Sequence, residues 1–170
     1  MGKAAESEML MSTQALVSLP VSVILSRKTV SRGALSIPSW SAVAVLAGES
    51  LASDGARGTM VRDDGDEKHF LWTGLSLEFF RDSAQSYWSN LVGQRPALYV
   101  ICHEQEDGDL FPASVTADHD EAGATIEGSD PVFTVPIPPE IYLRLEEFVV
   151  EHHMPKPPRK RKRKNWTGEK

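Results

Sequence analysis

The chain has little cysteine, no long apolar run and, over most of its length, no excess of positive charge. Cys102 is the single cysteine among 170 residues, which excludes an intramolecular disulfide framework and a cysteine-rich zinc or iron–sulfur module. No apolar stretch reaches the length of about 18 residues that a membrane-spanning helix requires. Apolar residues nevertheless make up 41% of the chain, which is enough for one domain with a packed core.

The charge is divided unevenly along the chain. Residues 155–170 contain eight Lys/Arg and one acidic residue, whereas the other 154 residues contain ten Lys/Arg and 23 Asp/Glu. An acidic body repels phosphate groups, so contact with nucleic acid is expected only through the basic tail. The tail is either an arm that binds RNA, DNA or an acidic protein, or a solubilising extension. Its basic run consists of Arg159, Lys160, Arg161, Lys162, Arg163 and Lys164.

These patterns predict three parts. We expect a flexible leader over residues 1–18, a single α+β domain over residues 19–154 and a disordered basic tail over residues 155–170. Three prolines in the tail stop any helix and favour an extended chain. The first 25 residues lack the positive start and the cleavage site of a secretory signal. We therefore expect a cytoplasmic protein that does not associate with membranes.

Hydrophobic periodicity predicts the strands. Leu71, Thr73, Leu75, Leu77 and Phe79 alternate onto one face of a strand, and Gly74 between them indicates a bulge or a close backbone approach. Segments rich in glycine, serine or aspartate predict loops over residues 31–38 and 48–68, the second being a loop or a long hairpin connection. The expected strands cover residues 21–28, 40–47, 69–79, 97–103, 110–116 and 132–137.

Two segments have the period of a helix. One begins near Asp82, which is a suitable cap, and Gly93 ends it; its expected buried face consists of Ala84, Tyr87, Trp88, Leu91 and Val92. The other begins at Pro138 and Pro139, with an expected buried stripe of Ile141, Leu145, Phe148 and Val149. Residues 118–124 predict a short helical turn. The fold class is therefore α+β, with a mainly antiparallel or mixed sheet of about six strands and two principal helices.

The chain offers few groups for catalysis or metal binding. Cys102 and His103 are adjacent in a strand and point to opposite faces, and a thiol inside an apolar strand is usually inert. His152 and His153 diverge by about 100° on a helix, unlike a same-face pair of zinc ligands. We therefore predict no catalytic, cofactor-binding or metal-binding residue. Trp40 and Trp72 are the candidate partner contacts, with packing in the core as the alternative.

Several segments together resemble an uncharacterised proteobacterial family, known as domain of unknown function 3305. The resemblance extends over residues 20–164. The segments that carry it are residues 23–28, Trp40 with residues 43–48, and residues 75–81, 87–91, 96–100, 112–117, 135–140 and 148–153.

Genes of this family commonly lie beside those for molybdenum-dependent formate dehydrogenases, iron–sulfur proteins and their maturation chaperones. The resemblance thus implies a non-catalytic accessory or assembly protein that binds a redox-enzyme subunit or another maturation factor. Two alternatives remain open. One is a nucleic-acid-associated regulator that uses the basic tail, and the other is an enzyme or cofactor-handling protein of unrecognised type.

Overall fold

The computed structural model describes residues 14–48 and 57–155. Within these residues the chain forms seven strands, three α-helices and one short 3₁₀ helix. The strands are β1 (Val17–Arg32), β2 (Leu35–Ala47), β3 (Arg57–Asp63), β4 (Glu67–Phe79), β5 (Ala97–Glu104), β6 (Leu110–Thr116) and β7 (Val132–Pro136). The helices are η1 (Arg81–Ser83), α2 (Ala84–Leu91), α3 (His119–Glu127) and α4 (Pro139–His152).

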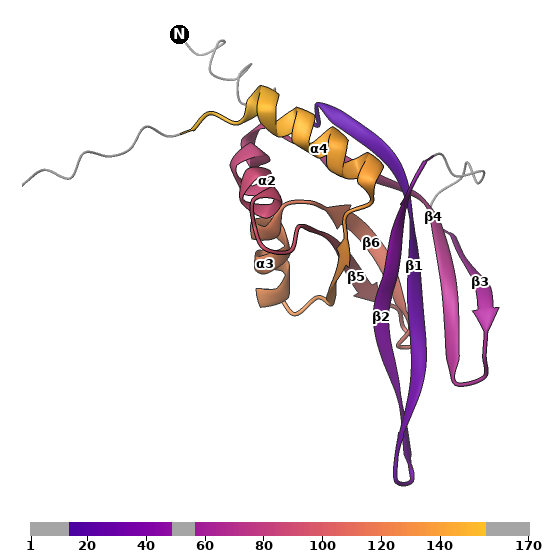
Figure 1. The fold of residues 1–170 in the computed structure, drawn as a ribbon. Coiled ribbons are helices and arrows are strands. Elements are labelled where there is room, and N and C mark those ends of the chain that lie inside the picture. Colours follow the sequence, from indigo (N-terminus) through magenta and orange to yellow (C-terminus); the bar gives the residue numbers. More distant parts are fainter. Residues whose placement is uncertain (1–13, 49–56, 156–170) are drawn as a thin grey trace, which may run out of the picture.

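The strands form one curled sheet in the order β2-β1-β4-β6-β5-β7, and β3 pairs with β4 beside this path. Every strand pair is antiparallel except β4 and β6. The curl brings β2 against β7 at the two ends of the order. Figure 1 shows α4 lying across one end of the sheet, while the β1–β2 hairpin reaches away from the helices. The sheet is therefore nearly barrel-shaped, with a core inside its curve.

The predicted α+β class with a mixed sheet is confirmed, but its element count needs correction. A third helix, α3, is longer than the helical turn expected at 118–124, and β3 lies in the segment expected to be a loop or hairpin connection. Residues 58–63 of β3 are exposed, so no apolar alternation marks them as a strand. The loop expected at 31–38 is also wrong. The turn is confined to Gly33 and Ala34, because the positive φ of 64° at Gly33 permits a two-residue hairpin.

Gly74 is the site of a bulge in β4, as predicted. Its φ is 77°, and the β1 partner of the strand moves from Val21↔Leu75 to Val23↔Trp72 across this point. β4 therefore holds one extra residue here, and the side chains beyond it change face. Trp72 faces the core opposite the fully buried Val23, and Leu71 does not.

Two helices complete the core. The predicted stripe of α4 is confirmed, since Ile141, Leu145, Phe148 and Val149 are all buried. On α2 the buried set is Ala84, Ser86, Tyr87 and Asn90, so the face is rotated from the expected one. Trp88 and Val92 are exposed instead. Burial of two polar residues here reflects their hydrogen bonds to neighbouring segments.

The two ends of the chain lie largely outside the described residues. β1 begins at Val17, inside the expected leader, and residues 1–13 of that leader lie outside the described residues. The same holds for residues 156–170, which include almost all of the expected tail. Among the described residues, no helix is both long enough and apolar enough to span a bilayer.

Candidate functional site

The structure brings Trp40 and Trp72, the two candidate contact residues, to one small pocket. Both indoles are partly buried and pack against the core. Trp40 contacts Phe70 with ring centroids 6.1 Å apart. Trp72 lies over Gly58, where an added Cβ would sit 2.7 Å from the indole. The pocket has a volume of about 180 Å³ and is lined by Trp40, Gly58, Phe70, Trp72, Gln105, Asp109 and Leu110.

Aromatic and cation–π contacts, rather than side-chain hydrogen bonds, hold the two indoles in place. The guanidinium of Arg27 lies 5.9 Å from the centroid of Trp40, and its Nη1 is 3.6 Å from Asp109 Oδ1. The buried indole N–H groups of Trp40 and Trp72 have no acceptor in the described part of the chain. Both tryptophans thus make structural contacts, and a partner-binding role for them stays a prediction.

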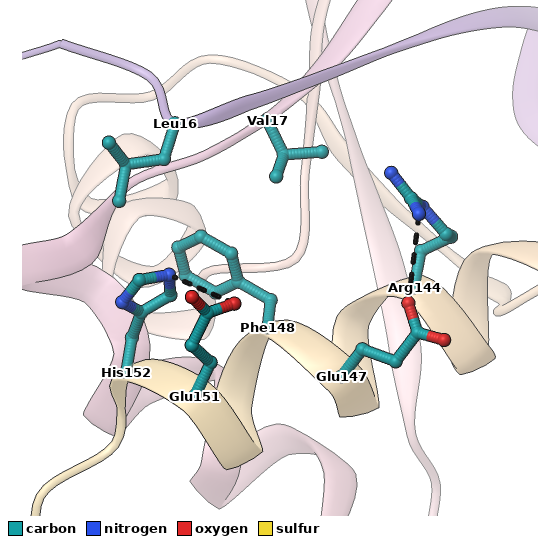
Figure 2. Close-up of a pocket in the computed structure, with 7 residues that line it drawn as sticks. All are labelled: Leu16, Val17, Arg144, Glu147, Phe148, Glu151 and His152. Carbon is teal, nitrogen blue, oxygen red and sulfur yellow. Dashed lines mark ion pairs between the residues drawn. The ribbon is translucent and has the colours of Figure 1, made fainter.

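A longer groove runs along α4 and is named here the α4 groove. One part has a volume of about 360 Å³ and is drawn in Figure 2, where Leu16 and Val17 face Phe148 across it. The second part has a volume of about 420 Å³, and Arg144 belongs to both parts. The complete lining is Leu16, Val17, Leu19, Pro20, Ala47, Gly48, Glu140, Ile141, Arg144, Glu147, Phe148, Glu151 and His152.

The lining residues of α4 recur at helical spacing and form one face of the helix. Ile141 and Phe148 are buried and give this face an apolar base. The rim is charged. Arg144 Nη1 lies 3.6 Å from Glu147 Oε2, and His152 Nε2 lies 3.7 Å from Glu151 Oε2, as Figure 2 shows. The glutamate side chains are 70% and 75% exposed, so these pairs contribute little stability and are free to exchange partners.

The opposite wall of the α4 groove is the first part of β1. On one side this segment pairs with β4, as in Val17↔Phe79. On its other side β2 reaches only as far as Val21↔Ala47, followed by one hydrogen bond from the Gly48 amide to the Pro20 carbonyl. Among the described residues, the edge of residues 17–19 therefore has no strand partner on this side. A helix face and an unpaired strand edge thus border the same groove.

A second polar cluster surrounds the start of α3. Asp118 is the N-cap, and its Oδ1 accepts hydrogen bonds from the amides of Asp120 and Glu121 and from Ser86 Oγ at 2.6 Å. Ser86 Oγ also lies 2.9 Å from His119 Nδ1. Asp118, His119 and Asp120 offer donor atoms within 4.8 Å of one another, a spacing that could hold a metal ion. The bonds to Asp118 are those of a helix cap, so the cluster has a structural role that needs no ion.

Replacing Asp118 by alanine is expected to destabilise the fold by about 1–2 kcal/mol at neutral pH. Burial opposes ionisation of Asp118, but the hydrogen bonds from Ser86, Ser83 and the two helix amides outweigh it and lower its pKa. This contribution is therefore present above the ordinary aspartate pKa and is lost as the pH falls through the lowered value. Urea unfolding between pH 7 and pH 3 should show the gap between the two proteins closing in acid. A gap that persists unchanged at pH 3 would contradict this account.

Cys102 is fully buried, while His103 beside it is half-exposed, as strand alternation predicts. Burial raises the pKa of the Cys102 thiol to about 12, so roughly one molecule in 10⁴ carries the thiolate at pH 8. We expect an aromatic disulfide reagent to modify the native protein at least 100-fold more slowly than the urea-unfolded chain. Equal rates in the two states would show that the thiol is accessible.

The last two histidines diverge, as their helical spacing predicts. His152 packs on Phe148 at a centroid distance of 4.5 Å, whereas His153 stacks on Trp88 at 5.0 Å. His153 Nε2 is also 2.7 Å from Gln85 Oε1. These contacts attach the end of α4 to α2. The six basic residues from Arg159 to Lys164 lie outside the described residues.

Sequence reasoning did not identify the α4 groove. A signal was available on the helix, because Glu140, Arg144, Glu147 and Glu151 follow one another at spacings of three or four residues. The opposite wall had no such signal, since an unpaired edge at residues 17–19 depends on where β2 ends.

Comparison with known proteins gives one match. No curated protein and no solved structure matches the chain. A family model matches residues 20–164, which is most of the sequence and agrees with the extent of the resemblance. The chain therefore belongs to the family described as protein of unknown function, DUF3305.

Proposed function

We propose that this protein is a non-catalytic accessory or assembly factor for a molybdenum- or iron–sulfur-containing redox enzyme such as formate dehydrogenase. It acts in the cytoplasm by binding a subunit of that enzyme or another maturation factor. The observation that carries the binding role is the α4 groove, which combines an apolar base, an exposed charged rim and a strand edge that no described residue pairs with. The choice of client rests on the family resemblance.

Deletion of the gene from its native organism tests this proposal. Formate dehydrogenase activity is expected to fall at least tenfold while the amount of the catalytic polypeptide changes little, because assembly rather than synthesis fails. The tagged full-length protein should restore activity and should copurify with a redox-enzyme subunit. Unchanged activity of molybdenum and iron–sulfur enzymes in the deletion strain would refute the role.

The basic tail supports a second candidate, a nucleic-acid-associated regulator. The observation that favours this candidate is the run of six consecutive Lys/Arg at 159–164. If six phosphates are contacted, affinity for duplex DNA should fall by about 10³ between 50 and 200 mM salt. Truncation of residues 155–170 should abolish that binding. Fluorescence anisotropy with a labelled duplex and a labelled single-stranded RNA measures both effects, and salt-insensitive binding or none would exclude this candidate.

A further inference from the structure

We propose that the α4 groove binds an extended peptide segment that adds a strand to the edge of β1 at residues 17–19, which lacks a strand partner within the described ranges 14–48 and 57–155, and that this segment carries apolar side chains together with lysine or arginine. The inference deepens the proposed function and rests on it, because it identifies the chemistry of the client segment.

The geometry of the two walls supports strand addition. The edge of residues 17–19 lies on the side of β1 that pairs with β2 further along the strand, and β4 occupies the opposite side. Backbone groups on such an edge are a ready template for hydrogen bonds with another chain. Extended peptides bind other domains in this way, with backbone bonds providing affinity and alternate side chains providing specificity. From Glu140 to His152 the helix is about 18 Å long, which matches about five residues of extended chain.

The lining of the α4 groove specifies apolar side chains in the bound segment. Ile141 and Phe148 form the base on the helix, and Val17 and Leu19 are half-buried on the strand. A strand added here directs every second side chain toward the helix. Ile141 and Phe148 are already only 1% and 3% exposed, so valine or leucine at those positions would remove from water mainly the exposed parts of Val17 and Leu19.

The rim specifies the charge. Glu140, Glu147 and Glu151 border the α4 groove with Arg144 as the single Lys/Arg of its lining. A lysine or arginine can lay its aliphatic stem over Phe148 and place its charge among these carboxylates. The remaining acidic surface of the body favours the same sign of ligand charge. An acidic or neutral segment would gain none of these interactions.

Binding of synthetic peptides to the full-length protein tests the inference. The probes are fluorescein-labelled eight-residue peptides of valine, leucine, threonine and lysine, matched peptides with glutamate in place of lysine, and N-methylated copies of the lysine peptides. We expect fluorescence anisotropy to detect the lysine peptides with a dissociation constant in the micromolar range. The glutamate peptides should bind at least tenfold more weakly, as should the N-methylated copies, which cannot form a backbone ladder.

Variants of exposed residues locate the site. The double variant Glu147→Lys with Glu151→Lys should weaken lysine-peptide binding at least tenfold, and Leu16→Asp should do the same from the other wall. Glu146→Lys makes one Glu→Lys change on the same helix outside the lining, so it should alter binding less than twofold. If Leu16→Asp fails to fold, the double variant carries the test, because both of its positions are exposed.

Three results would overturn the inference: equal binding of lysine and glutamate peptides, full tolerance of N-methylation, or no effect of the double variant. Sedimentation that shows a dimer dissociated by Leu16→Asp would assign the α4 groove to a second copy of this chain and would also overturn it. The peptides require no client. Peptide binding without an assembly defect in the deletion strain would therefore reject the proposed function alone, and the reverse pattern would reject only this inference.

Discussion

Replacing Phe148 by alanine is expected to lower the free energy of unfolding by about 3–5 kcal/mol, the usual cost of removing a buried aromatic ring. The side chain is 3% exposed. Its ring lies 5.4 Å from Phe79 on β4 and 5.8 Å from Tyr87 on α2, so one residue joins both helices to the sheet. The substitution leaves a cavity where three elements meet, and the fold cannot close it without moving α4.

Urea denaturation at pH 7, followed by far-UV circular dichroism, measures this effect. Leu143→Ala is the matched control, because Leu143 is on the same helix and is 59% exposed. Its substitution should change stability by less than about 0.5 kcal/mol. A loss below about 1 kcal/mol for Phe148→Ala would mean that α4 is not anchored through this ring.

Replacing Asn90 by alanine is expected to cost about 3 kcal/mol or more, although the residue is polar. Its Nδ2 donates to the carbonyls of Ala97 and Ala117 at 2.8 and 2.9 Å, and its Oδ1 accepts from the Ala97 amide at 3.0 Å. The residue is buried, so alanine would leave three backbone groups without these partners and away from water. Each orphaned group of this kind costs about 1–3 kcal/mol.

Comparing the urea unfolding of Asn90→Ala with that of Ser89→Ala separates the loss of buried hydrogen bonds from a change in helix propensity. Ser89 is partly exposed, and its hydroxyl donates to the Gln85 carbonyl one turn earlier, so its substitution should have an effect below about 0.5 kcal/mol. Asn90→Asp tests the direction in which stability changes with pH. A carboxyl in this buried position has a raised pKa, so its destabilisation should grow as the pH rises above about 4. A pH-independent loss would argue that the position is hydrated.

Local patterns were sufficient for much of the fold. Pro138 and Pro139, followed by the stripe from Ile141 to Val149, determine α4. A helix is the conformation that places four apolar residues at that spacing on one face. Gly74 marked the bulge of β4 because its positive φ is costly for other residues. Pro112, which has no backbone N–H to donate to a strand ladder, lies where the β5–β6 register shifts between Ile101 and Cys102.

Patterns failed where burial depends on distant segments. The face of α2 is rotated because Ser86 and Asn90 hydrogen-bond to residues 27–32 positions away, which no helical period records. Residues 70–73 face the opposite side of the sheet from the one predicted. An alternating pattern fixes the face of each residue only as far as a bulge, because the extra residue there shifts the alternation by one. β3 was missed because an exposed strand is recognised by its partner, β4, and not by its own side chains.

The amino-acid sequence by itself determined the division into an acidic body and a basic tail, the α+β class, the helix α4 and the family. The first three properties are local or cumulative, so they follow from composition and short-range period, whereas the family follows from the resemblance over residues 20–164. The tertiary structure alone decided that β2 ends opposite Val21 and leaves the edge of residues 17–19 beside α4. A groove is a relation between segments about 120 positions apart, and only their packing places an apolar base, a charged rim and a strand edge together.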